Sequence, residues 1–340
     1  MSKILVTGGL GYIGSHTVVE LINAGFEPVI VDDLSNSHPK ILDQITKITG
    51  HRPVFHQLDL SDEHTVKNLA TAEPDIAGII HFAAFKAVGE SVQQPLKYYR
   101  NNIYSLINLL ESYYGKPVNF VFSSSCTVYG QPDVLPVTEQ APIKPAQSPY
   151  GNTKQIAEEI LFDTVSAGSA YKVIALRYFN PVGAHDSALI GELPIGVPQN
   201  LVPFITQTAI GKREKITVFG DDYSTADGSC IRDYIHVVDL AKAHVAALKL
   251  MGNNNFSGYD VFNIGTGTGT SVLEAIKTFE KVSGVKLNYN MGPRRSGDVE
   301  QVWGNVSKAA EKLNWKTDLG IDTMMSSAWA WEKYLSQNPL

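Results

Sequence analysis

Cysteine is scarce in this chain, and its scarcity excludes whole classes of protein. Among 340 residues there are two cysteines, Cys126 and Cys230, and neither belongs to a Cys-x-x-Cys pair. A disulfide framework needs several cysteines at regular spacings, and a structural zinc site needs paired ligands. The sequence therefore predicts no disulfide scaffold and no metal site.

Long apolar runs and runs of basic residues are also lacking. No apolar stretch approaches the roughly 18 residues that a membrane-spanning helix requires, and the first residues enter a predicted strand without a signal-peptide layout. The net charge is -6, whereas proteins that bind nucleic acid generally carry clustered positive charge. We therefore expect a cytoplasmic protein that binds neither membranes nor nucleic acid.

A glycine-rich stretch near the start of the chain is the first chemical signal. Ile4-Leu5-Val6 predicts a buried strand, Gly8, Gly11 and Gly14 follow, and a helical pattern comes next. This order places backbone N–H groups and the positive end of a helix against a phosphate. The spacing Gly-x-x-Gly-x-x-Gly differs from the plain dinucleotide form, and a glycine-rich turn without a ligand is the alternative.

Strands and helices alternate through the first half of the chain. The pattern predicts strands at 27–31, 53–56, 78–82, 119–122 and 172–176, and helices at 61–72, 95–114 and 150–165. This alternation is typical of an α/β, Rossmann-type doubly wound parallel sheet. Residues 181–202 resemble a long loop over a site. Beyond them we predict helices at 203–210, 238–250, 271–282 and 321–334, and strands at 216–219 and 261–264.

An aspartate, Asp32, follows the second predicted strand, eighteen residues after Gly14. A carboxylate at this place accepts hydrogen bonds from the adenosine ribose and repels a 2′-phosphate, so NAD is favoured over NADP. The alternative is an ordinary turn aspartate. Because the glycine-rich turn precedes it, we favour the cofactor role.

Tyr150 and Lys154 form a Tyr-x-x-x-Lys pattern, which places both side chains on one face of a helix. A free tyrosine has a pKa of about 10. A nearby ammonium and the positive nicotinamide ring would both lower that pKa and make the phenol a better base. Ser125, at the mouth of the fifth strand, can share the hydrogen bond to a substrate hydroxyl. An exposed helical pair is the alternative.

A second glycine-rich stretch, 265–271, also follows a predicted strand. No acidic strand end comes after it at the distance that a dinucleotide site requires. We expect this stretch to turn a strand into a helix, with Thr270 or Ser271 as the N-cap.

Eight stretches of the chain carry motifs whose combination is specific to one group of enzymes. These stretches are 7–16, 32–37, 86–91, 123–130, 148–151, 177–184, 232–236 and 294–298. In these stretches the chain resembles the extended short-chain dehydrogenases/reductases and, among them, the UDP-glucose 4-epimerase family. The resemblance covers nearly the whole chain. It implies an NAD-dependent isomerase, a homodimer and a tightly bound cofactor that is retained through the reaction cycle.

The resemblance also implies how the chain is divided. Residues 1–180, together with about 235–265, would form the NAD-binding Rossmann domain. Residues 181–340 would form mainly a smaller α/β subdomain that binds the UDP-sugar. The implied catalytic residues are Tyr150, Ser125 and Lys154.

Two sets of ligand contacts follow from the resemblance, with Asp59 holding the adenine amine. The implied NAD contacts are Gly8, Gly11, Tyr12, Ile13, Gly14, Asp32, Asp33, Leu34, Ser35, Asn36, Ser37, Asp59, Leu60, Phe82, Ala83, Ala84, Lys86, Asn101, Ser125, Tyr150, Lys154 and Phe179. The implied UDP-sugar contacts are Lys86, Ser125, Tyr150, Tyr178, Asn180, Asn200, Leu201, Phe219, Arg232, Tyr234, Val272, Arg295, Asp298 and Val302. Arginines suit a diphosphate, and surface ion pairing is the alternative for Arg232 and Arg295.

In the implied reaction, Tyr150 removes the proton of the sugar 4-hydroxyl while C4 passes a hydride to the nicotinamide. The 4-keto sugar rotates and takes the hydride back on its other face. Two departures from the family stand out. Ala84 and Phe85 make the loop before Lys86 bulkier, and Val302 leaves room for an acetamido group. We therefore expect UDP-GlcNAc and UDP-GalNAc as further substrates, with core packing as the alternative role of Val302.

Three rival functions remain open at this point. A nucleotide-sugar 4,6-dehydratase normally carries an Asp-Glu pair after its serine or threonine run, where this chain has Cys126-Thr127. An epimerase of UDP-glucuronate or a UDP-pentose differs mainly in its pocket residues. A non-catalytic NAD-sensing protein has no need of Ser125, Tyr150 and Lys154 together.

Overall fold

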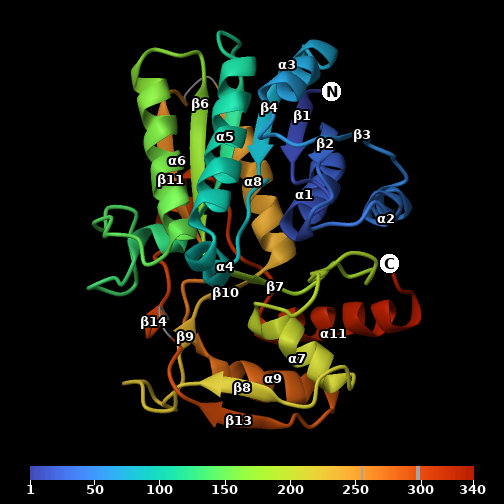
Figure 1. The fold of residues 1–340 in the computed structure, drawn as a ribbon, viewed down its shortest axis with the longest axis vertical. Helices are drawn as coiled ribbons and strands as arrows, with labels where there is room; N and C mark the ends of the chain where they lie inside the picture. Colours follow the sequence, from blue (N-terminus) through green and yellow to red (C-terminus); the bar gives the residue numbers. More distant parts are fainter. Residues whose placement is uncertain (254–255, 296–298) are drawn as a thin grey trace.

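The structure, a computed structural model, describes residues 1–253, 256–295 and 299–340. Seven parallel strands form the main sheet in the order β11-β6-β5-β4-β1-β2-β3, drawn in the upper half of Figure 1. Their bounds are β1 Lys3–Thr7, β2 Glu27–Asp32, β3 Val54–Gln57, β4 Ile76–His81, β5 Asn119–Ser125, β6 Lys172–Tyr178 and β11 Tyr259–Ile264. The predicted Rossmann-type parallel sheet is confirmed.

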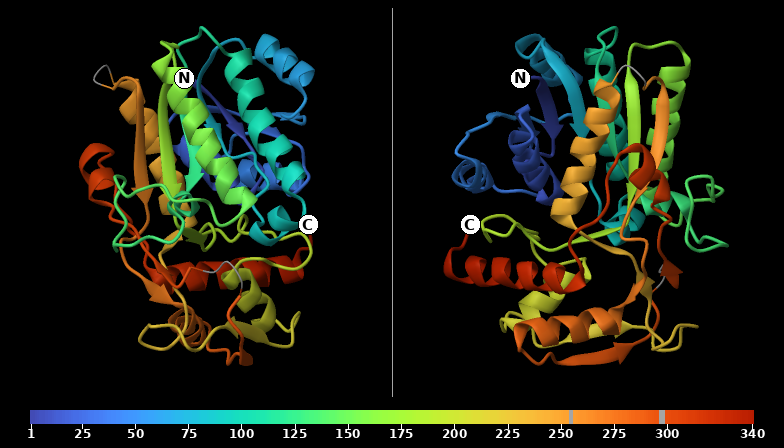
Figure 2. Two further views of the ribbon diagram at one scale, coloured as in Figure 1. Left: turned by 60° about the vertical axis from the view of Figure 1, so that its left-hand side comes forward. Right: turned by 180° about the vertical axis from the view of Figure 1, so that it is seen from behind.

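Two layers of helices cover the sheet, because successive side chains of a strand point to opposite faces. Ile4 and Val6 of β1 pack with α1 (Tyr12–Asn23), α2 (Lys40–Thr49) and α8 (Val237–Gly252). Leu5, between them, packs on the other face with α3 (Glu63–Ala72), α5 (Pro95–Ser112) and α6 (Pro149–Ser166). Figure 2 shows α8 on the face opposite to α5 and α6.

A smaller unit lies beneath the carboxyl ends of the strands (Figure 1). Its core joins α7, β8, α9 and α11 through Ile205, Val218, Phe279 and Met325. The bounds are β7 Asn180–Val182, α7 Leu201–Ala209, β8 Ile216–Phe219, β9 Ile231–Arg232, β10 Tyr234–His236, β12 Thr270–Ser271, α9 Val272–Ser283, β13 Tyr289–Gly292, β14 Gln301–Val302, α10 Ser307–Lys312 and α11 Ile321–Gln337. Two short helices complete the chain, namely α4 (Val88–Gln93) and the 3-10 helix η1 (Cys126–Tyr129).

The chain crosses between the two units several times. The strand β11 pairs with β6, and α8 packs on the sheet, so segments from the second half of the chain enter the first unit. Leu313 and Trp315, from the segment after α10, also belong to the core of that unit. This last segment lies outside the predicted returning range of 235–265. The boundaries of ligand-binding domains stay a prediction.

The predicted strand at 119–122 ends too early. β5 continues through Ser125, because the backbone of Ser123 to Ser125 stays paired with Leu176 to Tyr178 of β6. The strand was predicted from its apolar residues, and the polar serines at 123–125 do not extend that pattern. The pattern also missed α2, α4, α10 and the two- to four-residue strands of the second unit other than β8.

The order of the strands places the ligand crevice. Strand connections reverse direction between β1 and β4, and ligands of doubly wound sheets bind outside the carboxyl ends of the strands at that point. Gly8 follows β1, and Phe82 and Ala83 follow β4. A Cβ atom built on Gly8 would lie 3.0 Å from the backbone nitrogen of Ala83, so the two loops touch.

Candidate active site

The turn from β1 into α1 is open at the start of the helix. Gly11 is the N-cap of α1 and provides no side-chain hydrogen bond to it, so the first backbone N–H groups of the helix point outward without a capping side chain. Gly8 has φ +66°, and a Cβ on Gly14 would lie 2.1 Å from the Gly8 carbonyl oxygen. Only glycine fits at Gly14, and the turn keeps the shape of a phosphate cradle.

Asp32, at the end of β2, organises this turn. Its carboxylate accepts hydrogen bonds from the backbone nitrogens of Leu10 and Leu34, both at 3.0 Å, and from Ser37 Oγ at 2.6 Å. Burial raises the pKa of Asp32, while the bonds from Ser37, Leu34 and Leu10 oppose that rise. A carboxylate offers about four acceptor positions, so one remains for a ribose hydroxyl.

The loop after Asp32 is held in an unusual backbone conformation. Leu34 has φ +64°, which a leucine seldom adopts. The neighbouring Asp33 accepts a bond from the Ser35 backbone at 2.9 Å and lies exposed with Ser35 and Asn36. Asp59 is also exposed, and Leu60 beside it is buried. These positions stay predicted cofactor contacts.

Tyr150, Lys154 and Ser125 converge at the ends of β5 and α6. Ser148 caps α6 by accepting a bond from the Gly151 nitrogen at 3.1 Å, which begins the helix just before Tyr150. Lys154 Nζ donates to the Ser123 carbonyl at 2.7 Å and lies 6.0 Å from the centre of the Tyr150 ring. Tyr150, Lys154 and Ser125 are all buried. The predicted pair therefore faces the sheet rather than the solvent.

In the protein alone, the pKa of Tyr150 lies above its ordinary value, and the lowering expected from Lys154 together with the nicotinamide ring stays a prediction. Burial raises the pKa of Tyr150 above its ordinary value, Tyr178 adds to the rise, and a hydrogen bond with Ser125 opposes it. Burial also lowers the pKa of Lys154 to about 8, against the carboxylate of Glu158. The ammonium donates to the Ser123 carbonyl, which holds it 6.0 Å from the centre of the Tyr150 ring.

Asn102, which the sequence did not single out, joins the loop after β4 to α6, the helix that carries Tyr150 and Lys154. The Asn102 side chain accepts from the Phe85 nitrogen at 2.9 Å and donates to the Phe85 carbonyl at 3.1 Å and to Thr153 Oγ1 at 3.0 Å. Thr153 directly precedes Lys154. Asn101, which the sequence did predict, donates to Asn102 at 3.1 Å. No spacing pattern in the sequence distinguishes Asn102, which makes these structural bonds, from its neighbour Asn101.

A buried ion pair behind the predicted catalytic residues was also missed. Arg177 donates three hydrogen bonds to Glu158, from Nε at 2.9 and 3.2 Å and from Nη2 at 2.5 Å, and Ser124 Oγ donates to the same carboxylate at 2.5 Å. Glu158 lies one helical turn after Lys154. The pair therefore joins β5, β6 and α6 beneath the site. The only sequence signal was a glutamate at i+4 from the lysine.

Several predicted UDP-sugar contacts gather around β9 and β14. Val302 is the register partner of Arg232 in these two strands. Val302 also packs with Phe179, Val128 and Tyr129 in a small apolar cluster whose edge includes Cys126. Val302 therefore connects the strand that carries Arg232 with the apolar cluster beside Cys126, the residue after Ser125.

Other predicted contacts are spread over the smaller unit. Arg295 lies over the ring of the half-exposed Phe219, with its Cζ atom 5.6 Å from the ring centre. Asn180 begins β7 and is the register partner of Tyr234. Leu201, Tyr234 and Val272 pack with the core of this unit. Asp298 lies outside the described residues. Tyr178 Oη shares a hydrogen bond of 2.6 Å with Ser123 Oγ.

In the second glycine-rich stretch, 265–271, the side chain of Asp233 occupies the position where a ligand anion would bind. Asp233 is fully buried and accepts bonds from the Thr266 nitrogen, Thr266 Oγ1 and the Gly267 nitrogen at 2.7 to 3.1 Å. The helix that follows carries a capping box between Ser271 and Glu274. The predicted role as a strand-to-helix turn is confirmed, with Ser271 as the N-cap.

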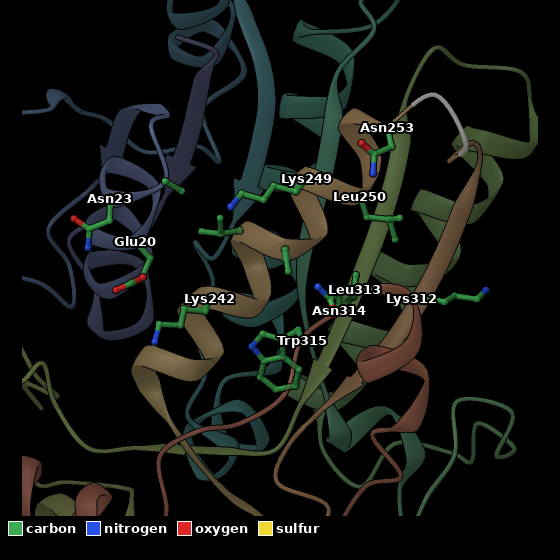
Figure 3. Close-up of a pocket in the computed structure, with 13 residues that line it drawn as sticks. Glu20, Asn23, Lys242, Lys249, Leu250, Asn253, Lys312, Leu313, Asn314 and Trp315 are labelled. Carbon is green, nitrogen blue, oxygen red and sulfur yellow. The ribbon is translucent and has the colours of Figure 1, made fainter.

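A cavity of about 600 Å³ lies elsewhere, on the opposite side of α8 from the sheet (Figure 3). Glu20 of α1, Lys242 and Lys249 of α8, and Trp315 line it, and no predicted site residue does. Among the described residues, no group of His, Cys, Asp or Glu side chains could hold a metal ion. In the same part of the chain, no helix is both long and apolar enough to cross a lipid bilayer.

The residues at the crevice fit a dinucleotide cofactor. A Cβ atom would fill the cradle at Gly14, the N-terminus of α1 is uncapped, and Asp32 keeps one acceptor position. Helix N-termini of this kind bind phosphates. The residues that would hold NAD are therefore the glycine turn, Asp32 and the loop after β4.

Comparisons with known proteins agree with this geometry. Residues 5–328 match the family described as GDP-mannose 4,6 dehydratase. UDP-glucose 4-epimerase 2 of Arabidopsis thaliana is 50% identical over 342 residues, which cover 99% of this chain and 96% of the relative.

Two solved structures are also similar over 99% of both chains. A UDP-glucose 4-epimerase from Stenotrophomonas maltophila with bound NAD and formylated UDP-arabinopyranose has a TM-score of 0.95 and 45% identity. A UDP-glucose 4-epimerase from Bifidobacterium longum in complex with NAD+ and UDP has a TM-score of 0.93 and 44% identity. The chain belongs to the extended short-chain dehydrogenases/reductases and, within them, to the UDP-glucose 4-epimerase family.

Proposed function

We propose that this protein is an NAD-dependent 4-epimerase of UDP-sugars, which interconverts UDP-glucose and UDP-galactose through a 4-keto intermediate. The observation that carries the proposal is the convergence of Ser125, Tyr150 and Lys154 at the crevice beside the Gly8 turn. When bound, NAD supplies a reversible hydride acceptor for C4 of the sugar. The glycine turn, Asp32 and the loop after β4 hold it there.

The protein's own part of the reaction is proton transfer and orientation. Tyr150 Oη takes the proton of the 4-hydroxyl and returns it after the 4-keto sugar has rotated in the pocket. Ser125 Oγ shares the hydrogen bond to that oxygen. Lys154, held by the Ser123 carbonyl, supplies positive charge near the phenol. Because burial raises the pKa of Tyr150, positive charge beside the ring is needed to make the phenol a base at neutral pH.

Dehydration is disfavoured by the residues at the strand end. The sequence lacks the Asp-Glu pair there, and burial raises the pKa of the Cys126 thiol to about 12. A thiol with that pKa stays protonated at neutral pH and does not act as a base. Thr127, which begins the turn with it, has no titratable group in the neutral range.

The residues beside Arg232 bear on which UDP-sugars the protein accepts. Val302 packs beside Phe179 and opposite Arg232, and valine is small enough to leave room for an N-acetyl group. We assign UDP-GlcNAc and UDP-GalNAc as further substrates. UDP-pentoses and UDP-glucuronate are the alternatives within the same chemistry.

We also assign the protein to the cytoplasm and to a homodimer. Large apolar side chains are exposed on neighbouring helices, with Leu96 at 81% and Tyr104 at 52% on α5 and Phe162 at 53% on α6. A second copy of the chain would remove such surface from water. Light scattering of the purified protein should give about twice the chain mass of 37.1 kDa.

Tyr150→Phe tests the proposed chemistry. The variant keeps the ring but loses the hydroxyl, so turnover of UDP-galactose should fall by about a thousandfold or more while NAD stays bound. The exposed Tyr114 offers a matched control, and Tyr114→Phe should behave as wild type. Near-normal turnover in Tyr150→Phe would exclude the proposed base. A panel of UDP-galactose, UDP-GlcNAc, UDP-glucuronate and UDP-xylose then defines the substrate range.

A further inference from the structure

One glutamate, Glu192, joins the two units across the crevice. It belongs to the long loop after β7, and its side chain is only 12% exposed. A single carboxylate oxygen, Oε1, accepts a hydrogen bond from Asn200 Nδ2 at 2.6 Å and lies 3.6 Å from Lys86 Nζ. Lys86 follows β4 in the first unit, whereas Asn200 precedes α7 in the second. Both are predicted UDP-sugar contacts, and Glu192 is not.

The position of Glu192 is fixed by the backbone around it. The chain doubles back where Ala184 pairs with Gly191, and a Cβ on Gly191 would lie 2.5 Å from the Trp331 ring. The Trp331 indole donates to the Glu192 carbonyl at 2.8 Å from α11. The buried ring therefore packs against Gly191 and holds the backbone of Glu192, while the carboxylate is held by Asn200 and lies near Lys86.

The first turn of α1 contacts the same loop. Tyr12, in the first turn of α1, donates from Oη to the Gly183 carbonyl at 2.7 Å. Tyr12 and Glu192 line one small cavity with Trp331, and the negative charge of Glu192 adds to the rise in the Tyr12 pKa that burial causes. The loop that carries Glu192 is thus fastened to the helix that begins the predicted NAD site.

The chemistry of the pair orients Asn200. A carboxylate only accepts hydrogen bonds, so the asparagine amide must direct its NH2 group toward Glu192. Its carbonyl oxygen then remains as the acceptor for a ligand donor. Asn200 provides no side-chain cap to α7, which leaves Glu192 as the described partner that sets its orientation.

We propose that Glu192 is a positioning residue that holds Lys86 and Asn200 in place across the crevice, and so keeps the nucleotide sugar and the NAD enclosed. This inference rests on the proposed function. Glu192 transfers no proton and contacts no reacting atom. Its removal frees Asn200 to rotate and loosens the loop that is bonded to Tyr12. The chemical step should therefore survive while binding weakens.

Glu192→Ala and Glu192→Gln test this role against Glu214→Gln, an exposed glutamate of the smaller unit. The Kd for UDP should rise about tenfold in Glu192→Ala, since a hydrogen bond to a charged group is lost. Glu192→Gln keeps an acceptor for Asn200 but loses the charge facing Lys86, so its effect should be smaller. The Kd is measured by calorimetry, and the NAD retained after gel filtration is measured by absorbance. The control should match wild type in both.

Kinetics separate this role from a general loss of structure. In Glu192→Ala the KM for UDP-galactose should rise with the Kd while kcat stays within about threefold of wild type. Unchanged or tighter UDP binding, together with full NAD retention, would overturn the proposal. A fall in kcat with unchanged KM would overturn it as well. If wild type binds UDP and NAD but converts no UDP-sugar, the proposed function fails, whereas the binding measurements still decide the role of Glu192.

Discussion

Two glycine-rich turns in this chain lead from a strand of the main sheet toward a helix, and they differ in what occupies them. The turn at Gly8 to Gly14 enters α1 without a capping side chain. The turn that starts at Gly265 is occupied by the buried carboxylate of Asp233, and its helix is capped by Ser271 and Glu274. An anion-binding turn and a structural turn therefore share a composition. The difference lies in whether the protein supplies its own anion.

Asp233 occupies its turn as a bound phosphate would occupy the first one. Its carboxylate faces two backbone N–H groups of Thr266 and Gly267, and a Cβ on Gly265 would lie 2.4 Å from Oδ2. In the first turn the nearest aspartate, Asp32, contacts the Leu10 nitrogen and stays at the side of the helix start. The first turn keeps its helix dipole available to a ligand.

The largest expected effect comes from closing the first turn. In Gly14→Ala the added Cβ would lie 2.1 Å from the Gly8 carbonyl oxygen, so the turn must shift and its phosphate cradle is lost. The NAD content of the purified protein should fall by about tenfold or more, since each 1.4 kcal/mol of strain costs a factor of ten.

Gly265→Ala is the matched variant at the second turn. Its Cβ would meet Asp233, so it should lower stability while NAD content per folded chain stays near wild type. Equal loss of NAD in both variants would mean that the two turns do not differ in function.

Lowering the pH should change the free energy of unfolding in opposite directions through the groups at the two turns. His81 Nδ1 lies 2.8 Å from Thr7 Oγ1, beside the first turn, and His16 lies in α1. Burial lowers the pKa of both histidines to about 3. The unfolded chain therefore binds more protons between pH 6.5 and 3, and stability falls as pH falls through that window. Burial raises the pKa of Asp233, so protonation of that residue favours the folded state as pH falls.

Urea unfolding at pH 7 and pH 5 measures this balance. The histidines should dominate, with a loss of roughly 1.4 kcal/mol per pH unit for each of them between about pH 6 and 4. His16→Gln should reduce the dependence on pH, whereas His51→Gln, at an exposed position, should not. A stability that rises from pH 7 to pH 5 would contradict this assignment.

A smaller effect is expected when the negative charge of Asp233 in the second turn is removed. In Asp233→Asn the amide NH2 would face backbone donors, so at least one buried donor loses its acceptor. The free energy of unfolding should fall by about 2 kcal/mol, as measured by denaturant titration. Asp221→Asn, at an exposed position, serves as the control. NAD binding should be unaffected. If Asp233→Asn lost NAD while the control kept it, the assignment of the cofactor to the Gly8 turn would be contradicted.

The sequence predicted the sheet, the first turn and the helix that carries Tyr150 because each depends on local order. Gly8, Asp32 and Tyr150 lie at strand ends or helix starts, where short-range patterns are informative. The second turn was also interpreted correctly, from the lack of an acidic strand end after it. The identity of its internal anion was not predicted, since Asp233 lies more than thirty residues away in the chain.

Contacts between distant segments account for what the sequence missed. Asn102 links the loop after β4 to Thr153, and Glu192 links that loop to Asn200. Neither residue belongs to a spacing pattern. The burial of Tyr150, which raises the pKa of its phenol in the protein alone, and the bond from Lys154 to the Ser123 carbonyl also appear only in three dimensions.

The most direct test of the account is the turnover of UDP-galactose by purified protein without added NAD. We predict that UDP-glucose forms, and that the denatured protein releases about one NAD(H) per chain, because the same hydride leaves and returns to the sugar. Failure to convert any UDP-sugar, or a need for added NAD in proportion to product, would contradict the assignment of the Gly8 turn as the site of a retained cofactor.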